Sequence, residues 1–174
     1  MDQVNLLNPE NIRRGPQQVK AAICYIFYNN MSLMIKRKKE PFSGHIVAAG
    51  GKFEEGETPF QCVEREIFEE TGLKIKNYKL KIVTSELGPN HYNWLLYLFV
   101  CEGFEGTLQE SDEGELCWVE KDKLLLEKMS DIDKKMLTYV LDDKRYFMKL
   151  RYDEDKNCTI EDIREFDENY NCSI

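Results

Sequence analysis

One short stretch limits what this chain can fold into more than any other, because it encodes a helix with both ends marked. Residues 48–73 read AAGGKFEEGETPFQCVEREIFEETGL. Thr58 suits the N-cap, Pro59 suits the first helical position, and Gln61 completes a capping box. Gly72 suits the left-handed residue that commonly ends a helix. Between these ends, apolar residues three and four positions apart predict a core-facing side made of Phe60, Val63 and Ile67.

The same helix carries an acidic side whose charges repel one another. Glu66, Glu69 and Glu70 lie at positions i, i+3 and i+4, so their Cβ atoms are about 6 Å apart or less. Like charges at this spacing cost roughly 0.2–0.5 kcal/mol per pair on an exposed helix, and Arg65, four residues before Glu69, offsets only part of that cost. A solvated acidic surface is the alternative interpretation of such a run.

The glycine pair just before the helix favours a metal site over a solvated surface. Gly50 and Gly51 form a turn that brings backbone carbonyls close to the helix start. Carboxylates that converge with backbone carbonyls make a site of hard oxygen ligands, which selects Mg²⁺ or Mn²⁺ rather than zinc. The sequence therefore predicts a divalent-cation site between this turn and the acidic side of the helix.

The composition is that of a globular protein, and its charge restricts the partners. The 174 residues suit one domain, or one domain plus a tail. No apolar run reaches the length of a membrane span. The net charge of −8 disfavours stable binding to a nucleic-acid backbone, which requires a basic face. A small polyanion can still bind if a divalent cation lies between the two sets of negative charge.

The cysteines and the first residues bear on the compartment. The six cysteines are scattered singly, without a CxxC pair, so a zinc site is not expected. The first residues lack the basic and apolar segments of a secretory signal. We therefore expect reduced thiols and a cytoplasmic protein.

The order of the predicted elements indicates an α+β fold with a mixed β-sheet flanked by helices. β-branched and aromatic runs bounded by turn residues predict strands within residues 19–28, 32–38, 45–51, 74–87, 91–102, 114–121 and 145–152. Helical spacing of apolar residues predicts a second helix from Ser130, its N-cap, to about Asp142. We expect a loose arm over 1–18, the domain over 19–152, and an acidic tail over 153–174. The tail is predicted to be either a short helix capped near Thr159 or unstructured.

The spacing of the glycine, glutamate and arginine residues in the first helix and just before it resembles the Nudix box. Gly51 is followed after five residues by Glu57 and after seven more by REIFEETGL, residues 65–73. No position departs from that pattern. The resemblance runs from about Val19 to Tyr152, and SDEGELCWV at 111–119 is similar to a segment of the MutT-like 8-oxo-dGTP diphosphatases. It implies a Nudix-type α/β/α sandwich and hydrolysis of a nucleoside diphosphate linked to another group.

The resemblance also implies roles for the acidic residues. It assigns Glu69 and Glu70 as ligands of Mg²⁺, with Mn²⁺ as the other candidate ion. Glu66 is implied to be either a ligand or the general base, and a carbonyl of Gly50 or Gly51 adds an oxygen. Glu113 is implied to bring a further carboxylate from a loop, and it is the other candidate for the base. Glu57 and Arg65 are expected to hold the loop against the helix, and Gly72 to end it.

The substrate-binding residues follow less directly. Lys52 and one of the basic residues Lys36, Arg37 and Lys38 are expected to meet phosphates, with surface lysines as the alternative reading. In MutT-like relatives an asparagine helps to recognise the purine, and in this chain Val47 occupies the corresponding position. Those relatives usually have a proline or phenylalanine before the glycine pair, and here that residue is Ala49. Asp131 remains as an acid that can bond a purine edge, or simply begins a helix. Trp94 can stack on a base or belong to the core.

Three functions remain open from the sequence, and the oligomeric state is open with them. The first is a pyrophosphohydrolase of nucleoside triphosphates, of the 8-oxo-dGTP type or broader, which releases a monophosphate and pyrophosphate. The second keeps this chemistry on ADP-ribose, dinucleoside polyphosphates or RNA 5′-triphosphate ends. The third is a non-catalytic Nudix ligand-binding module, which has no need of all three glutamates Glu66, Glu69 and Glu70.

Overall fold

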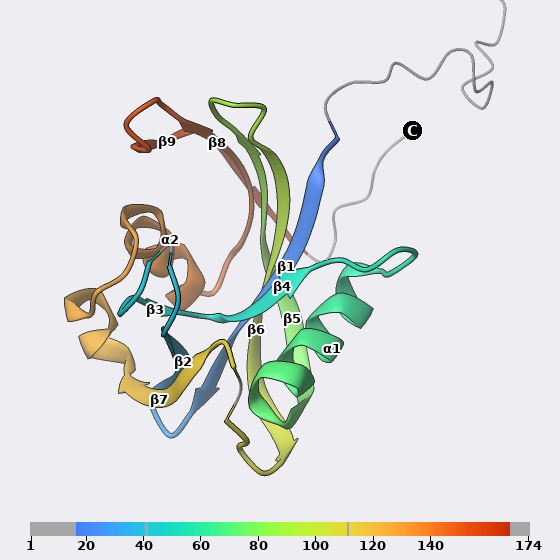
Figure 1. Cartoon of the computed structure of the whole chain (residues 1–174). Coiled ribbons are helices and arrows are strands. Elements are labelled where there is room, and N and C mark those ends of the chain that lie inside the picture. The colour runs from blue at the N-terminus through green and yellow to red at the C-terminus, as the bar shows by residue number, and fades with distance from the viewer. Residues whose placement is uncertain (1–16, 41, 111, 168–174) are drawn as a thin grey trace, which may run out of the picture.

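The structure is a computed structural model that describes residues 17–40, 42–110 and 112–167. A mixed sheet forms its middle layer, with one α-helix on each side (Figure 1). The helices are α1 (Pro59–Thr71) and α2 (Asp131–Leu141), and a 3₁₀ segment, η2 (Lys121–Leu126), precedes α2. This arrangement confirms the predicted α+β, Nudix-type sandwich. In the part of the chain described, no helix has the length and apolar character needed to cross a bilayer.

The described strands form one sheet in the order β3-β2-β1-β6-β5-β8-β9, with β4 paired to β1 and β7 to β2. The β1–β6 and β5–β8 pairs are parallel, and the other pairs are antiparallel. The strands are β1 (Val19–Tyr28), β2 (Met31–Arg37), β3 (Ile46–Val47), β4 (Ala49–Lys52), β5 (Leu73–Leu87), β6 (Asn93–Gly106), β7 (Gly114–Glu120), β8 (Arg145–Tyr152) and β9 (Cys158–Phe166). Eight of these nine described strands begin or end within a few residues of the predicted segments, and β3 and β4 share one segment.

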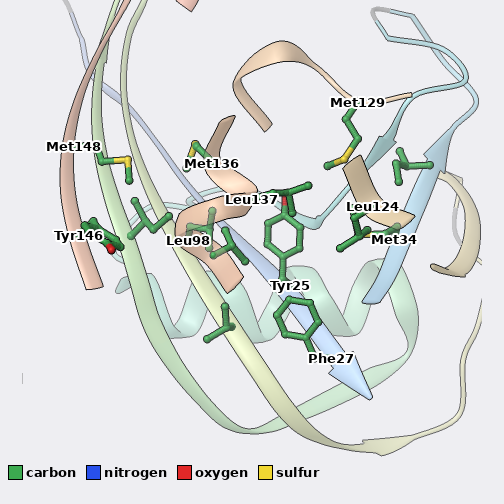
Figure 2. Close-up of a cluster of buried hydrophobic side chains, with 14 of the residues drawn as sticks. Tyr25, Phe27, Met34, Leu98, Leu124, Met129, Met136, Leu137, Tyr146 and Met148 are labelled. Carbon is green, nitrogen blue, oxygen red and sulfur yellow. The ribbon is translucent and has the colours of Figure 1, made fainter. Parts of the chain in front are cut away.

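The sheet separates two apolar cores because alternate residues of a strand face opposite sides. On β1, Ala22, Cys24 and Ile26 pack toward α1, whereas Tyr25 and Phe27 pack toward α2. Figure 2 shows the α2-side core, in which Tyr25 and Leu98 lie close to Leu137. Both helices are therefore held by the same central strands.

The caps of α1 are as predicted, and one residue of its apolar side is not. The Gln61 backbone N–H donates to Thr58 Oγ1 at 3.3 Å, and the Thr58 N–H donates to Gln61 Oε1 at 2.9 Å. Gly72 ends the helix with φ 76°. Val63 is buried, but Phe60 is 50% exposed, although its ring packs against Phe99 of β6. Cys62 is buried in its place.

The tail contributes an edge strand, where a short helix or no structure had been considered. Residues Cys158–Phe166 form β9, which pairs antiparallel with β8. Cys158 and Ile160 turn inward against the α2-side core, while most of the other residues of the strand are exposed. Alternation of this kind satisfies a strand and not a helix. Most of the predicted arm, residues 1–16, lies outside the described residues, and the domain limits stay a prediction.

An ion pair between a buried lysine and a partly exposed aspartate ties α2 to the long strand β5. A register shift between Leu80 and Ile82 turns Lys81 inward, and Lys81 is only 1% exposed. Its ammonium donates to the Asp142 carbonyl and lies 2.9 Å from Asp142 Oδ1. The Tyr146 hydroxyl donates to the other carboxylate oxygen at 2.5 Å. A single acidic residue at the end of α2 thus compensates a fully buried charge.

We expect Asp142→Ala to lower the free energy of unfolding by about 3 kcal/mol, because it leaves the Lys81 ammonium buried without its partner. Lys81→Met should cost less, since it removes the charge and keeps the volume. Urea unfolding of the two variants and of Lys81→Met/Asp142→Asn measures the difference. Equal losses for both single variants would contradict this account of the pair.

Candidate active site

A cavity of about 210 Å³ opens between β2 and β4, which pair with successive parts of β1. The second half of β1, Ile26–Tyr28, pairs with β2, and the earlier part, Ala21–Cys24, pairs with β4. Side chains and backbone from four strands, from both helices and from the segment before β7 surround this split. The lining residues are Ile23, Ile35, Arg37, Val47, Ala48, Gly50, Glu70, Glu113 and Asp133.

Gly50 is required by a close approach of backbone, whereas Gly51 lies against the end of a flexible side chain. A Cβ on Gly50 would lie 2.2 Å from the carbonyl oxygen of Ala22, and the φ of Gly50 is +145°, a conformation that residues with side chains rarely adopt. A Cβ on Gly51 would lie 2.5 Å from the carboxylate atoms of Glu66. The glycines therefore let β4 lie against β1 on one side and against α1 on the other.

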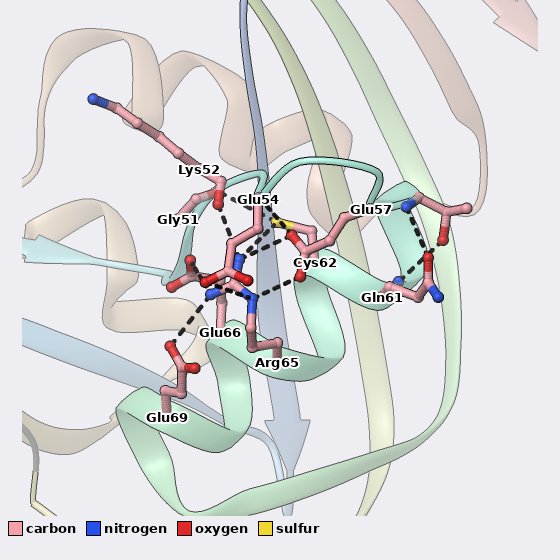
Figure 3. Close-up of polar contacts among 10 residues, drawn as sticks. Gly51, Lys52, Glu54, Glu57, Gln61, Cys62, Arg65, Glu66 and Glu69 are labelled. Atoms are coloured by element: carbon pink, nitrogen blue, oxygen red, sulfur yellow. Dashed lines mark hydrogen bonds and ion pairs between the residues drawn. The ribbon is translucent and has the colours of Figure 1, made fainter.

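The guanidinium of Arg65 joins the loop before α1 to the acidic side of the helix (Figure 3). It donates to both oxygens of Glu57 at 2.7 and 2.9 Å and to the Lys52 carbonyl at 3.0 Å. It also donates to Glu66 Oε1 at 2.8 Å and to Glu69 Oε2 at 3.2 Å. Hydrogen bonding from Arg65 lowers the pKa of Glu57 to about 2. These contacts are those expected of residues that position the loop.

The three glutamates of the acidic side differ in their surroundings. Glu69 is 57% exposed at its side chain and Glu66 is 15% exposed. Glu70 lines the cavity, and its Oε2 accepts a hydrogen bond from the Gly50 N–H at 2.7 Å. Burial, reinforced by the charges of Glu66 and Glu113, raises the pKa of Glu70 from 4.5 to about 7, against the opposing effect of the Gly50 hydrogen bond. The positive charge near Glu70 therefore does not compensate the burial of its carboxylate.

The donor atoms around this cavity fit a hard divalent cation. They are carboxylate and carbonyl oxygens, which Mg²⁺ and Mn²⁺ prefer. Within the described ranges, no three histidine, cysteine or acidic side chains already converge as a closed metal cluster, because Arg65 holds Glu66 and Glu69. A cation near Glu70 would offset the burial and the like charges that raise the pKa of that carboxylate.

The basic residues named from the sequence lie in different places. Arg37 lines the cavity, and its Nε is buried without a hydrogen-bond partner among the described residues. Lys36 and Lys38 are exposed and do not line the cavity. Lys52 lies with its Nζ 5.4 Å from the centroid of the Trp94 ring. Arg37 is therefore the cation that the fold brings to the cavity.

Of the base-binding candidates, the structure brings Val47 to the cavity and leaves Asp131 outside it. The Asp131 carboxylate is 68% exposed and pairs with Lys135 at 2.6 Å. Asp133, which the sequence reasoning missed, lines the cavity instead. It accepts a hydrogen bond from the Ser130 hydroxyl at 2.5 Å, and burial raises its pKa.

A signal for Asp133 was present in the sequence. Asp133 stands three, four and seven residues before the buried residues Met136, Leu137 and Val140. It therefore falls on the apolar side of α2, which faces the sheet, whereas Asp131 and Lys135 fall on the opposite side. The spacing that predicted the helix also indicated which aspartate points inward.

We expect Glu70→Gln to stabilise the metal-free protein in alkaline solution. The folded pKa of about 7 lies above the ordinary 4.5, so the folded protein binds the proton more tightly and parental stability falls as pH rises from about 4.5 to 7. Above that interval the variant should be more stable by on the order of 1–2 kcal/mol, since Glu70 is partly solvated. Near pH 4 the two proteins should be equal.

Denaturant unfolding in chelator between pH 4 and 8.5 measures this crossover. Addition of Mg²⁺ at pH 8 should reverse the order, because a bound cation stabilises the parent more than the glutamine variant. A variant that is less stable than the parent at every pH without metal would contradict the assignment of Glu70 as a crowded carboxylate.

The comparisons with known proteins agree with this geometry. The profile of the NUDIX domain matches residues 17–140. The chain is 36% identical over 89 residues to the ADP-ribose pyrophosphatase of Methanocaldococcus jannaschii, covering 50% of this chain and 52% of that protein. It is 32% identical over 122 residues to the oxidized purine nucleoside triphosphate hydrolase of Danio rerio, covering 66% and 74% respectively.

A solved structure adds the arrangement of the fold. The crystal structure of a MutT protein from Bacillus halodurans superposes with a TM-score of 0.73 at 29% identity, and the match covers 84% of this chain and 97% of that one. The chain spans about half the length of the first curated relatives that it matches. From the matched profile, the Danio rerio relative and the shared fold, the chain belongs to the Nudix family.

Proposed function

We propose that this protein is a Mg²⁺-dependent pyrophosphohydrolase of nucleoside triphosphates, which releases a nucleoside monophosphate and pyrophosphate. The observation that carries the proposal is that one cavity is lined by both Glu70 and Arg37. Glu70 is a buried carboxylate close to the like charges of Glu66 and Glu113, and the buried Nε of Arg37 has no hydrogen-bond partner in the described part of the chain. Glu70 would therefore be stabilised by a cation and Arg37 by an anion, and a metal-bound polyphosphate supplies both.

The acidic residues would hold the cation. Glu70 and Glu69 would contribute carboxylates from α1, the turn at Gly50 and Gly51 would contribute a carbonyl, and Glu66 would be either a further ligand or the general base. When bound, Mg²⁺ supplies charge neutralisation on the phosphates and lowers the pKa of a water molecule. The Arg65 hydrogen bonds to Glu57 would keep the loop against the helix when the cation is bound.

The remaining residues bind the substrate and take the proton. Arg37 can donate to phosphate oxygens from the β2 side of the cavity. Water attacks a phosphorus of the bridging diphosphate, its oxygen forms the new P–O bond, and the bridging P–O bond breaks. Glu66 or Glu113 accepts the proton of that water, and the displaced group leaves as pyrophosphate if the α-phosphorus is attacked, or as the nucleoside monophosphate if the β-phosphorus is attacked. A carboxylate is basic enough for this step once the water is acidified.

The base would meet a cavity wall that is mostly apolar. Val47, Ile23 and Ile35 offer no hydrogen bonds, so Asp133 is the polar group left to contact a purine edge. An apolar wall discriminates by only about 1–3 kcal/mol, whereas a wall built on hydrogen bonds rejects a mismatch far more strongly. We propose modest selectivity: 8-oxo-dGTP preferred over dGTP by roughly 10–100-fold at most, with other triphosphates also hydrolysed.

A second candidate substrate is ADP-ribose. The relative from Methanocaldococcus jannaschii is named for hydrolysis of that compound, and the metal-binding residues serve either substrate. A panel of 8-oxo-dGTP, dGTP, dATP and ADP-ribose separates the two when pyrophosphate release is assayed for the triphosphates and release of AMP and ribose 5-phosphate is assayed for ADP-ribose. Preferred cleavage of ADP-ribose would replace the first proposal with the second.

We expect turnover on the preferred nucleotide to vanish in chelator and to return with millimolar Mg²⁺ or Mn²⁺. Glu70→Gln keeps the shape and removes the charge, so kcat should fall about 100-fold or more, near 3 kcal/mol of barrier. Glu55→Gln is the matched control, because Glu55 is exposed in the loop and outside the cavity. Steady-state kinetics with undiminished turnover in chelator would exclude the metal-dependent reaction.

The two aspartates of α2 provide a separate test of base recognition. Asp133→Asn should raise KM for purine triphosphates by roughly 5–50-fold while kcat changes less, because it alters binding more than the reaction step. Asp131→Asn changes only an exposed ion pair. If the larger effect on KM appeared at Asp131, the original sequence-based assignment would be right and the role of Asp133 would be disproved.

A further inference from the structure

A row of side chains leads from the cavity to an aromatic pair at the start of β6. Ile23, in the cavity wall, pairs with Gly50, and Lys52 lies two residues further along β4. Trp94 pairs with Val19, four residues before Ile23 on β1 and so about 13 Å along the strand. Side chains two residues apart on a strand point to the same face. The cavity, Lys52 and Trp94 therefore follow one another on one face of the sheet.

The ammonium of Lys52 does not point to the glutamates. Figure 3 shows its side chain extending away from the Arg65 contacts. Its Nζ lies over the Trp94 ring, 5.4 Å from the centroid, which is the geometry of a cation–π contact. In the free protein, the basic residue next to the glycine turn thus covers one face of an indole.

The indole is held in one orientation by its neighbours. Tyr92 stacks beside Trp94 with the ring centroids 5.7 Å apart and 18° between the planes. The Tyr92 hydroxyl donates to Glu86 Oε2 at 2.9 Å, and the Thr84 hydroxyl donates to the other oxygen of that buried carboxylate at 2.6 Å. Tyr152 packs edge-on against Tyr92, with centroids 5.2 Å apart. A ring fixed before binding loses little freedom when a ligand stacks on it.

We propose that Lys52 and Trp94 exchange partners when substrate binds. The ammonium leaves the indole for the phosphates of the substrate, and the uncovered face of Trp94 then stacks on one face of the base, whose edge is directed to Asp133. The proposal rests on the proposed function, because it requires a nucleotide in the cavity. A charge-assisted contact with phosphate is stronger than a cation–π contact at a solvated site. The stack gained by the base repays the loss of the lysine contact.

The exchange makes the two halves of the substrate depend on each other. Phosphates draw Lys52 away and so open the face on which a base can stack. A nucleoside without phosphates must displace the ammonium by itself and gains no phosphate contact in return. Phosphate binding therefore favours base binding, and Glu86, Thr84, Tyr92 and Tyr152 act as positioning residues for the ring.

The test is a comparison of two probes on Trp94→Leu. The first is inorganic tripolyphosphate, and the second is a 2′-deoxyguanosine triphosphate analogue with an imido link between its α- and β-phosphates, both titrated calorimetrically with Mg²⁺. The analogue should bind roughly 5–100-fold more weakly to the variant, because the stack is lost. Tripolyphosphate should bind about 2–5-fold more tightly, because Lys52 no longer leaves a ring. Equal weakening of both probes, or no change in either, would overturn the exchange.

A fluorescence measurement tests the same exchange in a protein that keeps Trp94. The chain has two tryptophans, and Trp118→Phe on β7, outside the cavity, leaves Trp94 as the only one. Tripolyphosphate with Mg²⁺ should change the Trp94 emission in this protein and have no such effect when Lys52→Met is added. Deoxyguanosine should leave the emission unchanged at concentrations where the analogue saturates it.

The outcomes also separate this inference from the proposed function. Binding of tripolyphosphate without a change in Trp94 emission would overturn the exchange alone. Failure of both probes to bind in the presence of Mg²⁺ would overturn the nucleotide function and the exchange together. Opposite effects of Trp94→Leu on the two probes, with an emission change that needs Lys52, would support both.

Discussion

The close approach of β4 to β1 is the constraint on which the candidate site depends. Gly50 permits it, since any side chain there would collide with the Ala22 carbonyl. The approach places β4 beside the first part of β1, while β2 pairs with the last part, and the cavity lies in the split between them. It also aims the Gly50 N–H at Glu70. The backbone geometry of one glycine thus couples the sheet, the helix and the cavity.

Negative charge is concentrated at this point and is compensated unequally. Arg65 neutralises Glu57 and contacts Glu66 and Glu69, so these carboxylates cost the fold little. Glu70 faces the cavity, where burial penalises its ionised form more than the charge of Arg37 favours it. The protein therefore separates carboxylates that hold the loop in place from one that gains most from an added cation. Because an exposed acidic helix shows no such separation, the contrast argues for a binding site.

The two sides of the cavity serve different purposes under the proposed function. The α1 side carries the acidic groups, and it is the part that all hydrolysis of this type would share. The opposite side combines apolar strand residues with Asp133 from α2 and Arg37 from β2, and it would contact the part of the nucleotide that differs between substrates. Substrate choice can therefore change through β2, the segment before β4 and α2 without disturbing the caps and Arg65 contacts of α1.

Local features of the sequence determined the elements of this protein, and tertiary contacts decided which side chains share a space. The capping box at Thr58, the end of α1 at Gly72 and the β-branched and aromatic run of β1 involve neighbours within a few residues, so they were predictable. The acidic side of α1 was predictable for the same reason. The burial of Cys62 instead of Phe60, the pairing of β9 with β8 and the inward position of Lys81 depend on strands far away in sequence. The inward position of Asp133, rather than Asp131, was only partly predictable. Helical spacing indicated the direction of its side chain, but the cavity that it faces exists only because β2 and β4 pair with different parts of β1.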